Sequence, residues 1–384
     1  MSFFSGTPFF VLLTGIVLTA LVIGCMERSL RWLDLLASVG VVVVILSKTP
    51  EALIYFAVYF VLELLLVQLY ARIRQIHGRS AWRYRLFVLL SILPLVLCKL
   101  CETKPLAGMG WFGFTGISYL TFRVVQIIIE MYDGVITEVG VLDFAGFLLF
   151  FPTFSCGPID RSRRFTEDFH KVYQRAEYLE LFGRGLEKFM LGLAYKMVLA
   201  DLFYKLLQKL TLPTVPMMAG YAYVYGFYMF FDFAGYSLMA IGTGYMLGIC
   251  VPENFNRPFV AVDMKDFWAR WHISLSEWFR DFVFSRFVML SMKHKWFKTR
   301  LSGASVGFLV NMLVMGFWHG LSWHYILYGL YHGVLLAGTE IYQKKSKFYK
   351  RNKKKRWYRI ASWAVTINLV MFGFLIFSGH LIAV

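Results

Sequence analysis

Long apolar segments constrain this chain more than any other feature of its 384 residues. A membrane-spanning helix needs about 20 mostly apolar residues, and about eleven segments approach that length. Only 16% of the residues are charged, whereas soluble domains average about 25%. We therefore predict an all-α, polytopic integral protein of the cell membrane. The predicted membrane-embedded segments are 8–25, 32–47, 52–71, 86–101, 116–132, 141–157, 189–207, 217–249, 304–319, 323–342 and 358–380.

Basic residues predict how these segments cross the membrane. The formal net charge is +17, and Lys and Arg concentrate in cytoplasmic loops. Basic clusters in 72–85, 159–188 and 343–356 therefore predict three cytoplasmic loops and an N-terminus outside. Strict alternation of spans cannot satisfy all three clusters, so at least one segment must be re-entrant. Because such backbone is tolerated only where it is buried in protein or lines a cavity, we expect an internal cavity.

Two stretches of the C-terminal half depart from a simple span. Segment 217–249 is too long for one crossing, and its glycines can break it or allow close helix packing. In segment 251–303, apolar residues carry a basic rim, as in a helix lying at the membrane surface. Such a helix can rest on anionic lipid or dock an acidic carrier protein, and no basic recognition module indicates a nucleic-acid partner. The candidate carrier-binding residues are Phe287, Val288, Met289, Arg286, Lys293 and Lys295.

A histidine inside an apolar segment is the first candidate for catalysis. His319 lies in the run NMLVMGFWHGLSWHYILYGLYHG, and an ionisable residue at such a place is a functional hypothesis by default. An apolar environment favours the neutral imidazole, which can accept a proton as a general base. His272 lies instead in KDFWARWHISLSEWFRD, among aromatic and charged residues. For His272, the residues alone favour a hydrogen-bonded structural histidine.

The other polar residues of the apolar segments favour structural roles. His332 lies 13 positions beyond His319, which places it roughly 140° away around an ideal helix. Since no HExxH pattern is present, we expect no metal site. Arg123, Gln126 and Glu130 follow helical spacing within one segment and are expected to hold helices together.

Several long motifs carry a resemblance to a known family. They are GISYLTFRVVQIIIEMYDG at 116–134, FFPTFSCGPIDR at 150–161, FFDFAGYSLMAIGTGYMLGICVPENFNRPF at 230–259, DFWARWHISLSEWFRD at 266–281, and GFWHG followed by YGLYHG within 316–333. Through them the chain resembles the membrane-bound O-acyltransferases (MBOAT), and within that family the D-alanyl transfer proteins of Gram-positive bacteria. The resemblance covers roughly residues 115–335. It implies about eleven membrane-embedded helices of the MBOAT type, with re-entrant segments around a central tunnel.

The resemblance also implies an activity and its partners. D-alanine arrives as a thioester on the phosphopantetheine arm of a small acidic carrier protein and ends as an ester on teichoic acid outside the membrane. The histidine of the WHG motif, His319, is implied to be catalytic, and His272 is implied to position the acyl donor or the oxyanion. A membrane-anchored partner of the same pathway is a further expectation, and no cofactor is expected to be tightly bound. A single membrane domain is expected, with N-terminal spans in 1–110, a motif-bearing core in 111–340, and a basic loop and final span in 341–384.

Three alternatives stay open at this point. The bacterial alginate O-acetylases share several of the motifs, so an O-acetyltransferase of an exported polysaccharide is the first. Buried polar residues and broken spans also suit a transporter of a lipid-linked polymer, although we find no internal repeat. The third alternative is a non-catalytic scaffold that recruits a soluble carrier through its basic face.

Overall fold

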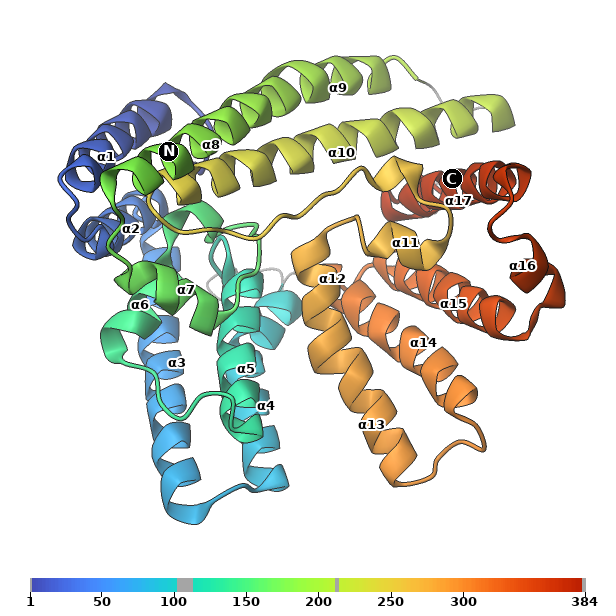
Figure 1. Ribbon diagram of the computed structural model, residues 1–384, viewed down its shortest axis with the longest axis horizontal. Coiled ribbons are helices and arrows are strands. Elements are labelled where there is room, and N and C mark those ends of the chain that lie inside the picture. Colours follow the sequence, from blue (N-terminus) through green and yellow to red (C-terminus); the bar gives the residue numbers. More distant parts are fainter. Residues whose placement is uncertain (1, 102–112, 211–213, 382–384) are drawn as a thin grey trace. The chain divides into compact units, whose positions relative to one another are not determined.

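The computed structural model describes residues 2–101, 113–210 and 214–381, and the secondary structure of these ranges is helical apart from two isolated β-bridges. The prediction of an all-α protein is confirmed. The chain forms two compact units, Met1–Leu193 with Tyr236–Pro252 and Ala194–Gly235 with Glu253–Val384 (Figure 1). The predicted boundary between residues 110 and 111 lies outside the described residues.

Within the described ranges, six helices are long and apolar enough to cross a membrane. They are α1 (Thr7–Cys25), α3 (Pro50–His77), α4 (Ala81–Cys101), α10 (Val215–Met246), α14 (Arg300–His319) and α17 (Arg356–Phe377). Each coincides with a predicted segment, which confirms a polytopic membrane protein. Three other predicted segments form helices that are shorter or more polar: α2 (Arg31–Leu46), α5 (Ile117–Asp133) and α15 (Trp323–Lys345). The predicted segment 189–207 is helical too, across the end of α8 (Arg175–Leu193), a π-helical turn η3 (Ala194–Ala200) and α9 (Asp201–Leu207).

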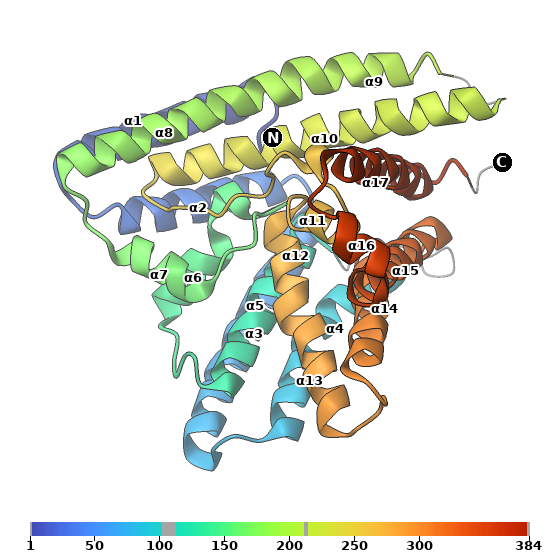
Figure 2. The ribbon, with the colours of Figure 1, turned by 45° about the vertical axis from the view of Figure 1, so that its right-hand side comes forward.

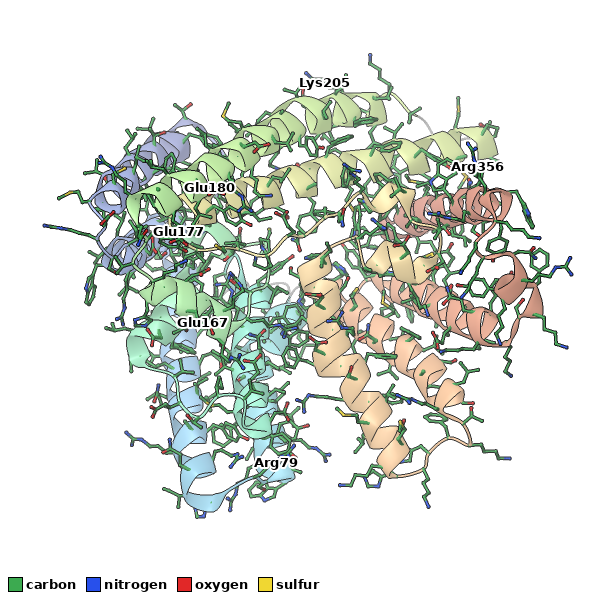
Figure 3. The ribbon with its side chains drawn as sticks, viewed as in Figure 1. Arg79, Glu167, Glu177, Glu180, Lys205 and Arg356 are labelled. Carbon is green, nitrogen blue, oxygen red and sulfur yellow. The ribbon has the colours of Figure 1, made fainter. Side chains whose placement is uncertain are left out.

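In the first unit, three long helices lie side by side (Figures 1 and 2). Helix α5 contacts both α3 and α4, and almost all of its residues are buried. The Tyr59 hydroxyl of α3 hydrogen-bonds the Thr121 hydroxyl of α5 at 3.3 Å, away from solvent. At the far end of α5, the exposed Arg79 pairs with Asp133 at 3.6 Å and is labelled in Figure 3. Helix α5 is therefore the centre of this bundle.

The prediction of a continuous span over 141–157 is wrong. Helix α6 (Val141–Leu149) ends after nine residues, which is about 14 Å of helix against an apolar membrane core of about 30 Å. A 3₁₀ turn, η2 (Phe151–Thr153), follows. The break leaves carbonyl groups that need donors, and the buried guanidinium of Arg123 on α5 supplies them. It donates to the carbonyl oxygens of Phe147 at 2.6 Å and of Thr153 at 2.7 Å.

The long segment 217–249 forms the single helix α10, so its glycines do not break it. The glycines instead allow neighbouring helices to pack closely, which was the second of the two predicted roles. In the first unit, a Cβ on Gly242 would lie 2.5 Å from the carbonyl oxygen of Gly185 on α8. In the second unit, a Cβ on Gly226 would lie 2.6 Å from the sulfur of Met371 on α17. Any larger residue at these two positions would force the neighbouring helix away.

In the second unit, α14 and α15 form a tightly packed pair joined by residues 320–322. A Cβ on Gly316 of α14 would lie 2.6 Å from the carbonyl oxygen of Tyr325 on α15. Helix α15 also packs against α17. Small residues thus let three helices approach at the end of α14, where His319 is the last residue. The remaining elements of this unit are η4 (Pro258–Val260), α11 (Met264–Trp268), α12 (Ile273–Phe279), the π-helical turn η5 (Arg280–Phe284), α13 (Ser285–Lys293) and α16 (Lys347–Asn352).

Candidate functional site

His319 ends α14 inside a set of aromatic rings. Tyr325 of α15 lies nearly parallel to the imidazole, with ring centroids 6.0 Å apart. Phe377 of α17 meets it edge-on at 5.1 Å, and Trp318 lies at 4.6 Å. The imidazole keeps partial exposure. Three helices therefore shape an aromatic surrounding that leaves His319 accessible.

His272 begins α12 in a conformation that side chains rarely adopt. Its φ of 45° and ψ of 55° lie in the left-handed region, which is costly for a residue other than glycine. The side chain is buried, with 4% exposure, and its ring meets Phe233 edge-on at 4.7 Å. Such strain persists only where the surroundings enforce it, so the position of this imidazole is set by the fold.

Burial decides the protonation state of His272. Loss of hydration, and after it the nearby charge of His319, lowers the pKa of His272 to about 3. The imidazole is therefore neutral at physiological pH, with one nitrogen protonated and able to donate a hydrogen bond. The neighbouring Trp271 and His319 both contact α17, at Phe374 and Phe377, with ring centroids 4.9 and 5.1 Å apart. Both histidines belong to the second unit, although they lie far apart in the sequence.

Asn254 holds the turn that carries His272. This side chain is fully buried, and its Oδ1 accepts a hydrogen bond from the Ser274 hydroxyl at 2.7 Å. The carbonyl oxygen of Asn254 accepts from the amide of Ile273 at 2.9 Å. In the same loop, Arg257 adopts a left-handed turn conformation. The positioning role of Asn254 was missed, because nothing local shows which loop it will contact.

His332 stands apart from the two candidate histidines. Its ring is fully buried, and its Nδ1 accepts a hydrogen bond of 3.4 Å from the indole N–H of Trp268 on α11. This contact links α11 to α15, which is a structural role. Tyr328 lies between the histidines of α14 and α15, with its ring 6.3 Å from His319 and 4.5 Å from His332. The predicted angle of roughly 140° assumed one continuous helix, which is wrong because α14 ends at His319 and α15 begins at Trp323.

A cavity of about 300 Å³ lies beside the His272 turn. Ile273, the residue after His272, is in its wall, together with apolar side chains of α11, α14 and α15. Its charged residues are Lys265, Glu277 and Arg280. The apolar wall residues include Trp268, Phe308, Met312, Met315 and Leu336. The cavity therefore has a mainly apolar wall with three charged residues.

The predicted carrier-binding residues of α13 divide into two groups. Met289 is 61% exposed, and Lys293 and Lys295 are exposed as well. Val288 instead packs on α14, where its side chain would lie 3.0 Å from a Cβ on Gly307. Phe287 contacts Trp296 and Phe297, with ring centroids 5.9 and 6.4 Å apart, and Arg286 is half-buried. The outward surface also contains Met292 and Trp296, which the sequence analysis did not single out.

No group of three or more His, Cys, Asp or Glu side chains in the described part of the chain has the geometry of a metal site. The candidate catalytic groups are two imidazoles, the accessible one of His319 and the buried, neutral one of His272. They lie in one unit, with aromatic rings around the first and an apolar cavity beside the second.

Comparisons with known proteins identify relatives along the whole chain. The model of the membrane-bound O-acyltransferase family matches residues 127–382, which include both histidines. The chain is 40% identical to the teichoic acid D-alanyltransferase of Streptococcus thermophilus, over 98% of this chain and 95% of that protein. It is 39% identical to the teichoic acid D-alanyltransferase of Bacillus subtilis, over 99% of this chain and 98% of that protein. A probable alginate O-acetylase of Pseudomonas aeruginosa is 33% identical over 69% of this chain and 48% of that protein.

Proposed function

Because this chain belongs to the membrane-bound O-acyltransferase family, we infer that it is an O-acyltransferase that transfers D-alanine to teichoic acid. The observation that carries this conclusion is the extent of the similarity. The chain and the teichoic acid D-alanyltransferases align over nearly the full length of both. The alignment with the alginate O-acetylase covers only about half of that protein, which disfavours acetyl transfer.

We propose that His319 is the general base. The teichoic acid hydroxyl attacks the carbonyl carbon of a D-alanyl thioester, so that a C–O bond forms while the C–S bond breaks. His319 takes the hydroxyl proton and returns it to the departing sulfur, which leaves as a thiol. Partial exposure of the imidazole supports this role, because a base must reach its substrate. The rings of Tyr325 and Phe377 limit the access of water, which would otherwise hydrolyse the thioester.

We propose that His272 stabilises the transition state as a neutral hydrogen-bond donor. A charged imidazole would be costly at this buried position, whereas an N–H held rigidly by the surrounding fold needs no reorganisation during the reaction. The strained turn and the Asn254 contact support such a fixed orientation. The contacts of Trp271 and His319 with the same helix, α17, support placing both histidines at one reaction centre.

The donor is proposed to be the phosphopantetheine arm of an acidic carrier protein. The cavity beside Ile273 supports this choice, since its apolar wall suits a pantetheine chain. The exposed Met289 and the lysines near it offer a surface for an acidic partner. A tunnel through about eleven membrane-embedded helices would then join the donor on the cytoplasmic side to the acceptor outside.

The test is a transfer assay with purified protein in lipid vesicles. The vesicles receive lipoteichoic acid together with D-alanyl thioester of the carrier or, in parallel, acetyl thioester. We expect D-alanyl esters on the polymer and at most trace acetyl esters. Acetyl transfer alone would reject the assignment of the acyl group. Carrier binding without transfer of either group would favour a scaffold, and movement of a lipid-linked polymer without acyl transfer would favour a transporter.

A further inference from the structure

A second cavity, of about 400 Å³, lies in the second unit where α15, α16 and α17 meet. Figure 2 shows α16 between the ends of the two longer helices, and Figure 3 labels Arg356, the first residue of α17. None of its wall residues belongs to the candidate active site. Its wall includes the charged residues Lys353, Arg359 and Asp263, and the hydroxyl groups of Tyr342, Tyr358 and Ser362.

Positive charge dominates this cavity. Lys353 and Arg359 are exposed wall residues, and no carboxylate among the described residues pairs with either. The one acidic wall residue, Asp263, is already engaged. Its carboxylate accepts from the amide of Lys265 at 2.9 Å and from the Gln343 side chain at 2.9 Å. With two cations and one carboxylate, the wall keeps a net positive charge that can attract an anion.

A smaller cavity of about 330 Å³ adjoins the first and extends its basic character. It shares Val262 and Arg359 with the larger cavity and adds Lys354 and Arg356. Two tyrosine hydroxyls also lie in the wall of the larger cavity, where Tyr358 donates to the hydroxyl of Tyr342 at 3.1 Å. Cations combined with hydroxyl donors are a suitable environment for a phosphate group.

An apolar track leads from the basic end along the membrane span. Trp357, Ala361, Val365 and Leu369 line the same cavity, and their spacing of four residues places them on one face of α17. Val365 is 60% exposed. The exposed Trp357 and Phe348 lie at the start of this track, as aromatic residues commonly do at the level of lipid head groups.

We propose that these joined cavities bind an anionic phospholipid. Its phosphate lies between Lys353 and Arg359, its head-group hydroxyls contact the tyrosine hydroxyls, and an acyl chain follows the track on α17. The track distinguishes a lipid from an acidic protein, because only a lipid places a phosphate and a long apolar chain together at the end of a span. The predicted cytoplasmic side of segment 343–356 agrees with this ligand, since anionic lipids concentrate in that leaflet.

The experiment measures lipid binding to the purified full chain in detergent by native mass spectrometry. Dioleoyl phosphatidylglycerol is titrated against dioleoyl phosphatidylcholine, with inorganic phosphate in a parallel series. The double variant Lys353→Glu/Arg359→Glu is compared with Lys350→Glu/Arg351→Glu. The second variant makes the same change in charge within the same basic cluster but outside both cavities.

We expect phosphatidylglycerol to bind the wild type and the control variant equally, and to bind the Lys353/Arg359 variant at least about tenfold more weakly. Phosphatidylcholine should bind weakly to all three. Ser362→Phe fills the cavity without changing charge and should weaken phosphatidylglycerol binding as well. This substitution keeps the test informative if the double variant fails to fold.

Four results would overturn the proposal. Equal losses in the two double variants would show a diffuse electrostatic attraction. Competition by inorganic phosphate at full strength would show a site for a free anion. Loss of binding to an acidic carrier protein, with phosphatidylglycerol binding intact, would show a protein-docking surface. Unchanged lipid affinity in Ser362→Phe would show that the lipid does not occupy this cavity.

Discussion

Arg123 in the first unit and His319 in the second are both ionisable residues among apolar side chains, but their surroundings differ. The guanidinium of Arg123 is buried, and its two terminal nitrogens donate to carbonyl oxygens at the break after α6. The imidazole of His319 is partly exposed and faces aromatic rings. An ionisable residue in an apolar segment therefore indicates function where its side chain stays accessible, and a structural role where it is buried among backbone acceptors.

The largest expected effect is on D-alanyl transfer, when His319 is replaced. His319→Ala should lower D-alanyl transfer by about 10³-fold, because general-base catalysis contributes about 10²- to 10⁴-fold. Thermal stability should change little. The control is His77→Ala, which removes an exposed histidine at the end of α3. Transfer retained at the wild-type rate would remove His319 from the mechanism.

Replacing Arg123 should lower the stability of the protein rather than its transfer activity. Arg123→Met leaves several buried carbonyl oxygens without donors and should cost about 3 kcal/mol or more of folding free energy. Thermal unfolding of the purified protein measures this loss, and activity per folded molecule should be nearly normal. Arg79→Met removes an exposed arginine at the end of the same bundle and should cost less than about 1 kcal/mol. Comparable losses in the two variants would contradict the role of Arg123 at the break.

The buried histidine of the site predicts a pH dependence. The folded-state pKa of His272 is about 3 and its ordinary value is 6.5, so between these values the unfolded chain holds the extra proton. The stability contribution of neutral His272 is therefore present above pH 6.5 and is lost as the pH falls, by about 1.4 kcal/mol per unit. At pH 5 the loss amounts to about 2 kcal/mol.

The measurement for this prediction compares thermal unfolding of the wild type and His272→Gln between pH 7 and pH 5. The wild type should lose more stability than the variant, because glutamine does not titrate. Parallel curves for the two proteins would show that His272 is protonated as readily in the folded state as in the unfolded state.

The smallest effect concerns the surface of α13. Met289→Asp places a negative charge on an exposed position near Lys293 and should weaken binding of an acidic carrier about tenfold. Val288→Asp should instead reduce folding, because Val288 packs against Gly307. Met26→Asp, an exposed methionine at the end of α1, should leave carrier affinity unchanged. Equal affinities of the Met289 and Met26 variants in a binding titration would exclude this surface.

Part of the candidate site was predictable from sequence because the relevant signal is local. An imidazole in a long apolar segment is visible without any knowledge of the fold, so His319 was identified from its neighbours and from the family motif. Val288 was wrongly grouped with the outward residues. The sequence of a short amphipathic helix does not show which apolar residues pack on the adjacent helix and which stay exposed to a partner protein. Asn254 was missed for a related reason, since its contacts with residues 273 and 274 depend on how two loops meet.

The sequence alone determined that the protein is helical and lies in a membrane, because the length and apolarity of a segment set its transfer into lipid. The basic clusters and the family motifs could also be identified from the sequence. Contacts in the folded chain account for the break in segment 141–157, for the donors that Arg123 supplies there, and for the unbroken α10. They also bring Trp271, next to His272, and His319 against the same helix, α17. These outcomes depend on contacts between residues distant in the chain, which the pattern of neighbouring residues does not specify.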